Sequence, residues 1–375
     1  MRIAILTLPL HTNYGGILQA YALQTILERM GHEVCVIERR PRPTRLPLWK
    51  MPYSYGKRII KNLTGHPYPV FYEQKKDREA PVVAQNTNKF INKYIKRRVV
   101  NEFSDIHKED FNSIVVGSDQ IWRPKYFPKI ETAYLNFTKD WNIKRIAYAA
   151  SFGTDEWEYS PKQTQNCRHL ITKFEAVSVR EKSGIDLCHK YLDVNAKQVL
   201  DPTLLLKTED YISLFKSIGV PKSPGNLLGY ILDNTPEKVS FIDHIAKLKG
   251  LIPFRVDSKV ENKIAPLNER IQPPLENWLR GFYDAEFVIT DSFHACVFSI
   301  LFHKLFFVIG NKERGMSRFQ SLLSMFGLED RLVDIHSPIN LNSNIDWNDV
   351  DNVLNKKREE ARRFLTNSLA VSYGK

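Results

Sequence analysis

Residues suited to acid–base and anion-binding chemistry stand within one apolar stretch, residues 286–309, EFVITDSFHACVFSILFHKLFFVI. Asp291, Ser292 and His294 follow a short β-rich run and precede an apolar segment of helical length. Histidine changes charge near neutral pH, and a helix N-terminus attracts anions. We therefore expect His294 to face an anion-binding cleft. Helix caps beside an interior histidine produce the same pattern, so that alternative stays open on these residues alone.

Polar residues and glycines also follow other predicted strands. They are Gly15 and Gly16 after 2–8, Asp119 and Gln120 after 114–116, Arg180 after 176–179, and Arg314 and Arg318 after 305–309. The carboxyl ends of parallel strands meet at one edge of a sheet, where such folds bind ligands. Arginine matches carboxylates and phosphates with paired hydrogen bonds, and bare glycine backbone admits an anion closely. A tight turn explains the two glycines equally well.

The elements that must position these residues alternate between strands and helices, and the alternation restarts after residue 205. We expect strands at 2–8, 34–37, 114–116, 145–150, 176–179, 227–232, 252–256, 287–290, 305–309 and 332–335. We expect helices at 17–30, from Ser160-Pro161 onward, and at 236–249, 275–283, 293–302, 319–326 and 346–369. Such repeated β-α-β patterns predict an α/β protein with two parallel sheets.

The composition of the chain limits which kinds of ligand and which cellular locations are expected. The chain has 375 residues, enough for two ordinary domains, and a net charge of +12 that fits an acidic ligand, an anionic membrane surface or nucleic acid. No nucleic-acid-binding signature accompanies the dispersed basic residues, so we expect no nucleic-acid partner. No apolar run is long enough to span a bilayer, and the first ten residues fit a strand better than a signal peptide. The four cysteines form no C-x-x-C pair, which favours reduced thiols in a cytoplasmic protein.

Residues 41–76 interrupt the alternation with many prolines, tyrosines and basic residues. We interpret this segment as a long insertion loop. Its aromatic and basic side chains suit a membrane surface or an acceptor sugar, and an ordinary surface insertion is the plain alternative.

Six segments, in order, resemble the bacterial polysaccharide pyruvyl transferase family. They are NYGGILQAYALQ (13–24), VVGSDQIW (115–122), SVREKSG (178–184), DPTLLL (201–206), ITDSFHA (289–295) and MSRFQSLLSMFGLEDRLV (316–333). The resemblance implies a glycosyltransferase-B-like architecture, with two Rossmann-like domains facing a cleft and a C-terminal helix that crosses back. The corresponding boundaries are 1–205, 206–340 and 341–375.

The family activity that this resemblance implies is transfer of the enolpyruvyl unit of phosphoenolpyruvate onto two sugar hydroxyls. The products are a cyclic pyruvate ketal and phosphate, and the acceptor is a surface-polysaccharide unit, often lipid-linked. We expect phosphoenolpyruvate as the donor substrate, no cofactor and no metal. We also expect a cytoplasmic location that extends to contact with the inner face of the membrane.

The reaction assigns roles to the candidate residues. His294 is the general acid, and Asp119 or Asp291 orients or deprotonates the attacking hydroxyl. The residues expected to bind the donor are Arg180, Arg314, Arg318, Ser292, Gly15 and Gly16. The residues expected to bind the acceptor are Asn13, Tyr14, Gln120 and Trp122. Many relatives have the arrangement T-D-R-L-H-G, whereas this chain has Ser292 and Phe293 before the histidine and Ala295 after it. Arg314 or Arg318 is then expected to supply the missing charge.

Two other functions remain as alternatives. One is a glycosyltransferase that uses a nucleotide sugar on the same architecture, although the second half shows no acidic ribose-binding signature. The other is a non-catalytic carbohydrate- or membrane-binding relative, which would have no need for arginines and a histidine at strand ends.

Overall fold

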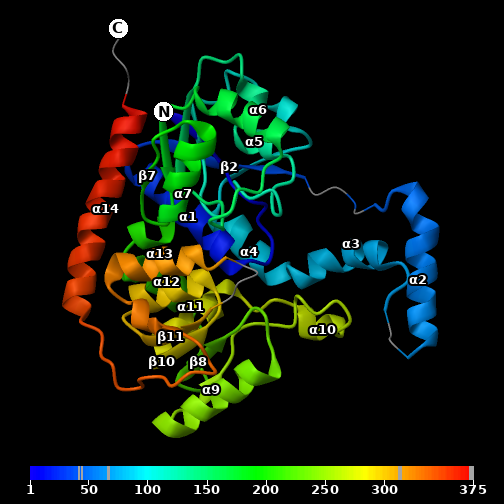
Figure 1. Cartoon of the computed structure of the whole chain (residues 1–375), viewed down its shortest axis with the longest axis vertical. Coiled ribbons are helices and arrows are strands. Elements are labelled where there is room, and N and C mark those ends of the chain that lie inside the picture. The colour runs from blue at the N-terminus through cyan, green and yellow to red at the C-terminus, as the bar shows by residue number, and fades with distance from the viewer. Residues whose placement is uncertain (41–42, 44, 66–67, 311–314, 371–375) are drawn as a thin grey trace.

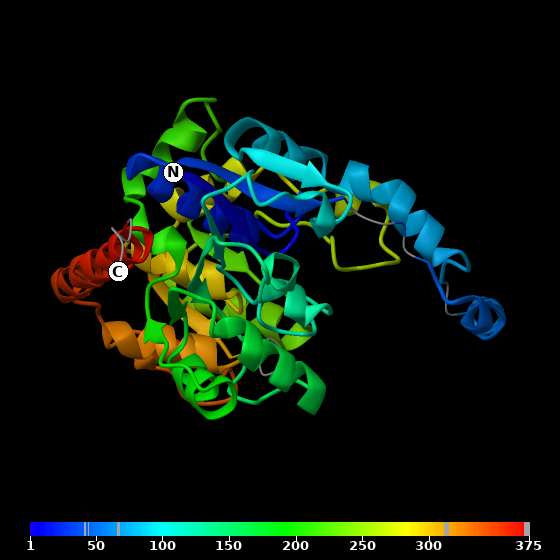
Figure 2. The same ribbon diagram turned by 90° about the horizontal axis from the view of Figure 1, so that it is seen from above.

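The computed structural model describes residues 1–40, 43, 45–65, 68–310 and 315–370. Two open parallel sheets form the framework, one in each half of the chain, and helices lie between and around them (Figure 1). A view from above shows the same arrangement, with one helical arm extending away from the body (Figure 2).

The N-terminal sheet has seven strands in the order β3-β2-β1-β4-β5-β6-β7. The strands are β1 (Arg2–Leu6), β2 (Glu33–Arg39), β3 (Arg97–Val100), β4 (Ser113–Val116), β5 (Lys144–Ala150), β6 (Ala176–Val179) and β7 (Lys197–Gln198). All neighbouring pairs are parallel, and the order reverses direction between β1 and β4. Ligands of doubly wound sheets bind at such a switch point.

The C-terminal sheet has five parallel strands in the order β12-β11-β10-β8-β9, and its switch point lies between β8 and β10. The strands are β8 (Leu227–Tyr230), β9 (Pro253–Phe254), β10 (Phe287–Thr290), β11 (Leu305–Ile309) and β12 (Leu332–Val333). The two sheets confirm the expected pair of Rossmann-like domains in a glycosyltransferase-B-like arrangement.

Helices connect these strands. In the first half they are α1 (Tyr14–Arg29), α2 (Met51–Leu63), α3 (Tyr72–Val83), α4 (Gln85–Tyr94), α5 (Ile130–Ala133), α6 (Pro161–Ile171) and α7 (Lys182–Leu187). In the second they are α8 (Thr208–Lys216), α9 (Pro236–Lys249), α10 (Leu267–Arg270), α11 (Leu275–Asp284), α12 (Phe293–Leu301), α13 (Ser317–Phe326) and α14 (Trp347–Leu369). Short single turns are η1 (Leu48–Lys50), η2 (Phe103–Asp105), η3 (Asn136–Thr138), η4 (Cys188–Leu192), η5 (Pro202–Leu205) and η7 (Glu329–Arg331). No helix in the described ranges is both long and apolar enough to cross a membrane.

Local sequence signals explain where the central helices begin. The Asn13 side chain caps α1 by accepting from the N–H of Gly16, and Ser292 caps α12 by accepting from the N–H of Ala295. Ser160 and Pro161 start α6, as the sequence predicts. Every residue of β10 and α12 is buried, so this unit lies inside the C-terminal domain.

The last helix, α14, begins in the C-terminal domain and packs back on the N-terminal one. The Arg358 guanidinium donates to the carbonyl oxygens of Leu204 (2.6 Å) and Leu206 (2.7 Å). The ring of Phe364 lies 6.2 Å from that of Tyr148 on β5. The crossing helix expected from the sequence is therefore present.

One part of the first half differs from the sequence prediction. Residues 41–76 were expected as a loop, but η1, α2 and the beginning of α3 occupy most of the described part of this segment. Arg97 and Arg98 begin β3, an edge strand on which Arg98 is exposed and Arg97 is partly exposed. Charged residues are common on edge strands because they discourage pairing with another chain.

Candidate active site

Two helix N-termini meet between the domains. α1 starts after β1 of the first sheet, and α12 starts after β10 of the second. The two helices approach each other at Gly15 and His294. A Cβ added at Gly15 would lie 2.1 Å from Nδ1 of His294, so only glycine fits against this ring. His294 is 6% exposed and therefore lies inside the interface.

We expect Gly15→Ala to displace the His294 ring, to lower the free energy of unfolding by about 1–3 kcal/mol, as overpacking does, and to abolish activity. Gly16→Ala is the matched control, because the nearest atom to its Cβ would be Nδ2 of Asn13 at an ordinary 3.4 Å. Chemical denaturation measures both variants. Equal unfolding free energies for the two would show that the contact between Gly15 and His294 is not tight.

A buried ionic cluster lies directly behind His294. Arg180, at the end of β6, donates to Oδ2 of Asp201 at 2.8 Å and to Oδ1 of Asp119 at 3.3 Å. Nε2 of His294 lies 3.5 Å from the same Oδ2 of Asp201. The side chains of these four residues are at most 8% exposed. The histidine of one domain therefore shares a carboxylate with the arginine of the other.

Asp201 is held in its charged form. Burial acts to raise the pKa of its carboxyl group, but the neighbouring His294 and Arg180 outweigh burial and bring the pKa well below its usual range. Its other oxygen, Oδ1, accepts from the N–H and hydroxyl of Thr203 at 3.0 and 2.7 Å. Asp201 thus orients both the candidate acid and the candidate anion-binding arginine.

Asp119 reaches the cluster through an uncommon backbone conformation. Its φ is 60°, in the left-handed region that aspartate tolerates better than most residues. The N–H of Ser151, at the end of β5, donates to its carbonyl oxygen at 3.0 Å and anchors the turn. This turn lies after β4, at the switch point of the first sheet.

A second arginine approaches from the other domain. The ring of Phe293 lies against both guanidinium groups, with its centroid 4.3 Å from Cζ of Arg180 and 5.4 Å from Cζ of Arg318. Burial, followed by the nearby charge of Arg180, lowers the pKa of Arg318 to about 10. Two buried arginines that repel each other are an arrangement that a bound anion would stabilise.

Asp291 and Ser292 take structural positions. Both carboxylate oxygens of Asp291 are occupied: they accept from the N–H groups of Leu232 (2.6 Å) and Asp233 (3.1 Å) and from Nζ of Lys238 (2.7 Å). Asp291 therefore ties β10 to the loop after β8 at the second switch point. Ser292 caps α12, so the capping alternative describes Ser292, whereas Asp291 braces the neighbouring loop.

The residues predicted to bind the acceptor are not brought together as one surface. Trp122 has no exposed surface and stacks on Tyr134 at 4.9 Å, inside the N-terminal domain. Tyr14 is also fully buried, and its hydroxyl donates to the carbonyl oxygen of Pro273 at 2.7 Å, which joins the two domains. In this conformation an acceptor cannot touch either side chain, and their assignment to acceptor binding stays a prediction.

The remaining predicted residues have mixed positions. Asn13 is exposed at the start of α1, and Gln120 is nearly buried, with its Oε1 accepting from Arg123 at 3.3 Å. Arg314 lies outside the described residues. After it, Gly315 approaches the N-terminal domain so closely that a Cβ there would lie 1.7 Å from the carbonyl oxygen of Gly153.

Asp201 is the site residue that the sequence prediction missed. It lies in the segment DPTLLL, after the apolar pair Val199-Leu200, where the carboxylate looks like a cap for the following turn. Its Oδ1 does accept from the N–H of Thr203, as a cap would, and its Oδ2 contacts Arg180 and His294. Its place at the end of a buried segment, like that of Arg180, was the signal available.

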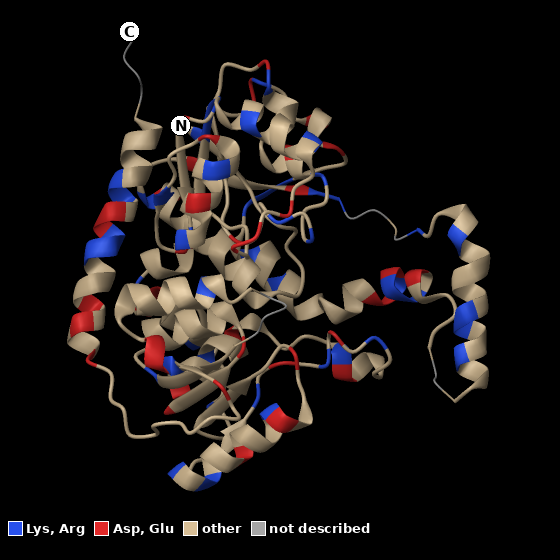
Figure 3. Cartoon of the chain, viewed as in Figure 1, with Lys and Arg blue, Asp and Glu red and all other residues tan. Residues whose placement is uncertain are grey.

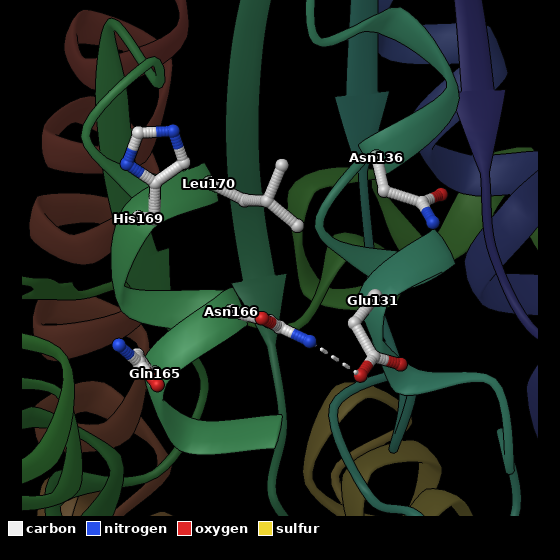
Figure 4. Close-up of a pocket in the computed structure, with 6 residues that line it drawn as sticks. All are labelled: Glu131, Asn136, Gln165, Asn166, His169 and Leu170. Atoms are coloured by element: carbon white, nitrogen blue, oxygen red, sulfur yellow. Dashed lines mark hydrogen bonds between the residues drawn. The ribbon is translucent and has the colours of Figure 1, made fainter. Parts of the chain in front are cut away.

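Two hollows differ greatly in size and position. The one at the cluster, lined by Arg180, Asp201, Phe293 and Arg318 among others, measures about 10 Å³, close to the space for one water molecule. The larger, about 520 Å³, is an open depression on the N-terminal domain between α5, η3 and α6 (Figure 4). Glu131, Asn166 and His169 line it, and none of them belongs to the cluster. Among the described residues, no group of three or more His, Cys, Asp or Glu side chains is placed to hold a metal ion.

Comparison with known proteins places the chain in a family. Solved structures similar to it include UDP-GlcNAc 2-epimerase from Methanocaldococcus jannaschii, at 13% identity and a TM-score of 0.47 over 98% of this chain and 100% of that one. Another is UDP-GlcNAc 2-epimerase from Neisseria meningitidis bound to UDP-GlcNAc, at 8% identity and a TM-score of 0.45 over 99% of this chain and 95% of that one. A third is Acinetobacter baumannii MurG, at 11% identity and a TM-score of 0.39 over 98% of this chain and 93% of that one. No curated protein gives a significant sequence match. The family described as polysaccharide pyruvyl transferase matches residues 13–313, most of the chain, and the chain therefore belongs to this family.

Proposed function

We propose that the protein transfers the enolpyruvyl unit of phosphoenolpyruvate onto two hydroxyls of a sugar, forming a cyclic pyruvate ketal and releasing phosphate. The observation that carries this proposal is the shared carboxylate: Oδ2 of Asp201 contacts both His294, at 3.5 Å, and Arg180, at 2.8 Å. A histidine beside a charged carboxylate can hold and deliver a proton, and adjacent arginines suit a substrate that carries a carboxylate and a phosphate.

The chemistry assigns one step to each group. His294 donates a proton to the methylene carbon of the enol, which leaves positive charge on the central carbon. A sugar hydroxyl attacks that carbon and loses its proton to a carboxylate. Phosphate then departs with the electrons of its C–O bond, and the second hydroxyl attacks the same carbon and loses its proton to close the ring. Asp201, whose Oδ2 lies 3.5 Å from Nε2 of His294, positions the ring for the first transfer.

Asp119 is the better candidate for the base. Its Oδ1 makes one long contact, 3.3 Å, to Arg180. Asp291 was the other candidate, but Lys238 and two backbone N–H groups already occupy its oxygens. A carboxylate whose oxygens already accept from three donors has little room to accept from a sugar hydroxyl.

Arg318 is our candidate for the charge that the sequence lacks before His294. Its guanidinium lies beside Phe293, the residue that directly precedes the histidine. Arg180 already binds two carboxylates, so the donor would have to share it with Asp119 and Asp201 or displace Asp119 from it. The N–H groups at Gly15 and Gly16 and the start of α12 add neutral donors.

We further propose that the acceptor is a sugar of a surface or capsular polysaccharide precursor, carried on a lipid, and that the reaction takes place in the cytoplasm at the inner face of the membrane. Exposed Asn13 and nearly buried Gln120 remain candidates for acceptor contact. The donor substrate supplies the energy of the reaction, so no further cofactor enters the scheme.

Thermal unfolding with phosphoenolpyruvate, pyruvate, phosphate or nucleotide sugars tests the donor. We expect phosphoenolpyruvate to stabilise the protein by about 2.7 kcal/mol at 100 times its dissociation constant. Arg318→Met should remove this response, because it deletes the guanidinium that lies beside Phe293, next to His294. Arg280→Met, which removes an ion pair to Asp284 on α11, should keep the response. A response to a nucleotide sugar alone would instead support glycosyl transfer.

A further inference from the structure

The arm formed by η1, α2 and the start of α3 presents an apolar face that packs on nothing in the described chain. Figures 1 and 2 show α2 standing away from both domains, with α3 as its only broad connection. Trp49, Tyr53, Ile60 and Leu63 are large apolar residues whose exposure ranges from 62% for Ile60 to 81% for Leu63. No residue of α2 is buried.

The face is built by helical spacing. Tyr53, Gly56, Ile60 and Leu63 follow one another at intervals of three, four and three, which aligns them along one side of α2. Trp49 precedes Tyr53 by four residues and continues the same line into η1. The face is therefore an ordered stripe rather than a scatter of single exposed residues.

The opposite side of α2 is fixed to the arm. Arg58 donates to both oxygens of Glu73, at 2.6 and 2.8 Å, and to the carbonyl oxygen of Val70 at 2.8 Å. The ring of Tyr55 packs edge-on against Phe71 at 5.2 Å. These contacts determine which side of the helix faces outward.

Positive charge accompanies the apolar face. Exposed Lys57 and Lys61 form a row beside the stripe, and Lys50 lies over the ring of Trp49 at 4.7 Å. The stretch 48–63 contains no Asp or Glu, and Figure 3 shows α2 with basic and no acidic residues. A helix with aromatic and aliphatic residues on one side and lysines beside them suits the headgroup region of an anionic bilayer.

We propose that α2 binds the surface of an anionic lipid bilayer, with Trp49, Tyr53, Ile60 and Leu63 entering the headgroup layer and the lysines contacting lipid phosphates. A second copy of the chain fits this face less well. A symmetric contact through it would bring two rows of lysines together with no carboxylate on either stretch 48–63 to pair them. This assignment stands independently of the donor chemistry, because it uses no residue of the Asp201 cluster.

Flotation of the full chain with vesicles tests the proposal. We expect binding to vesicles that contain phosphatidylglycerol, weaker binding to phosphatidylcholine alone, and release by salt. The triple variant Lys50→Gln, Lys57→Gln, Lys61→Gln should lower the partition coefficient on anionic vesicles about 100-fold, because each lysine near such a surface contributes about 1 kcal/mol. The matched control, Lys162→Gln, Lys222→Gln, Lys247→Gln, removes three exposed lysines elsewhere and should bind like the wild type.

Two further variants separate insertion from simple attraction. Ile60→Glu should abolish binding while thermal unfolding stays unchanged, because the side chain is exposed. Binding should shift the tryptophan emission to shorter wavelength, and Trp49→Phe should remove the shift while preserving most of the binding. The proposal is wrong if the wild type does not bind anionic vesicles, or if both lysine triple variants lose binding equally. It is also wrong if Ile60→Glu converts a dimer to a monomer while vesicle binding stays unchanged.

Discussion

Replacement of His294 by glutamine is expected to reduce turnover by about 10²–10⁴-fold, the usual contribution of general acid catalysis. Glutamine can still donate a hydrogen bond toward Asp201, but it carries no transferable proton. Phosphate release from phosphoenolpyruvate, in the presence of the proposed lipid-linked acceptor, measures turnover. Thermal unfolding checks that the fold survives.

The matched control is His303→Gln. His303 follows α12, and its Nε2 lies 2.9 Å from Oδ1 of Asp351 in a pair that is more than 40% exposed. We expect wild-type turnover from this variant. Should His294→Gln also retain near-normal turnover, the proton must come from another group and the assignment of the acid fails.

Asp201→Asn is expected to have the largest effect on stability. The asparagine keeps an acceptor for the N–H of Thr203 but leaves Arg180 without its shortest ionic contact. Removal of one partner from a buried pair typically costs about 3–5 kcal/mol. Turnover should fall as well, because the carboxylate that contacts both His294 and Arg180 is replaced by a neutral amide. Asp210→Asn is the control, since Asp210 pairs with Arg29 near the surface and such pairs contribute at most about 1 kcal/mol.

The difference between wild type and Asp201→Asn should depend on pH. The pKa of the Asp201 carboxyl is lower in the folded protein than the usual value of about 3.9. Its contribution to the unfolding free energy is therefore complete above about pH 4 and is lost as the pH falls toward the folded pKa. Urea denaturation of both proteins across this range measures it. A constant difference down to strongly acidic pH would indicate that the charge of Asp201 is not what stabilises the fold.

The central β-α-β unit could be predicted well from the sequence, because its apolar runs, its capping residue and its segment lengths all indicate the same structure. The bounds of β10 and β11 match the prediction, and Ser292 caps α12 where a capping residue was seen. The arm was missed for the opposite reason. Its prolines, tyrosines and lysines resemble a loop, and α2 buries no face that would have made its periodicity compelling.

The candidate site was only partly predictable, because side-chain direction at a strand end depends on tertiary contacts. Arg180 and Asp291 both follow strands, yet one turns into the interface and the other braces a neighbouring loop. Trp122 comes from the same segment as Asp119 but packs into the core. The pairing of Asp201 with His294 joins two domains, so no local pattern in either segment could reveal it.

The small hollow at the cluster has a consequence for measured affinity. About 10 Å³ cannot hold a phosphate and a carboxylate, so the proposed donor would bind only to molecules in which the interface has opened. The apparent dissociation constant is then the intrinsic one divided by the open fraction, and an open population of about 1% weakens it about 100-fold. Any partner that holds the domains apart would raise the open fraction and so lower the apparent dissociation constant for the donor. It would do so without touching any substrate-binding atom.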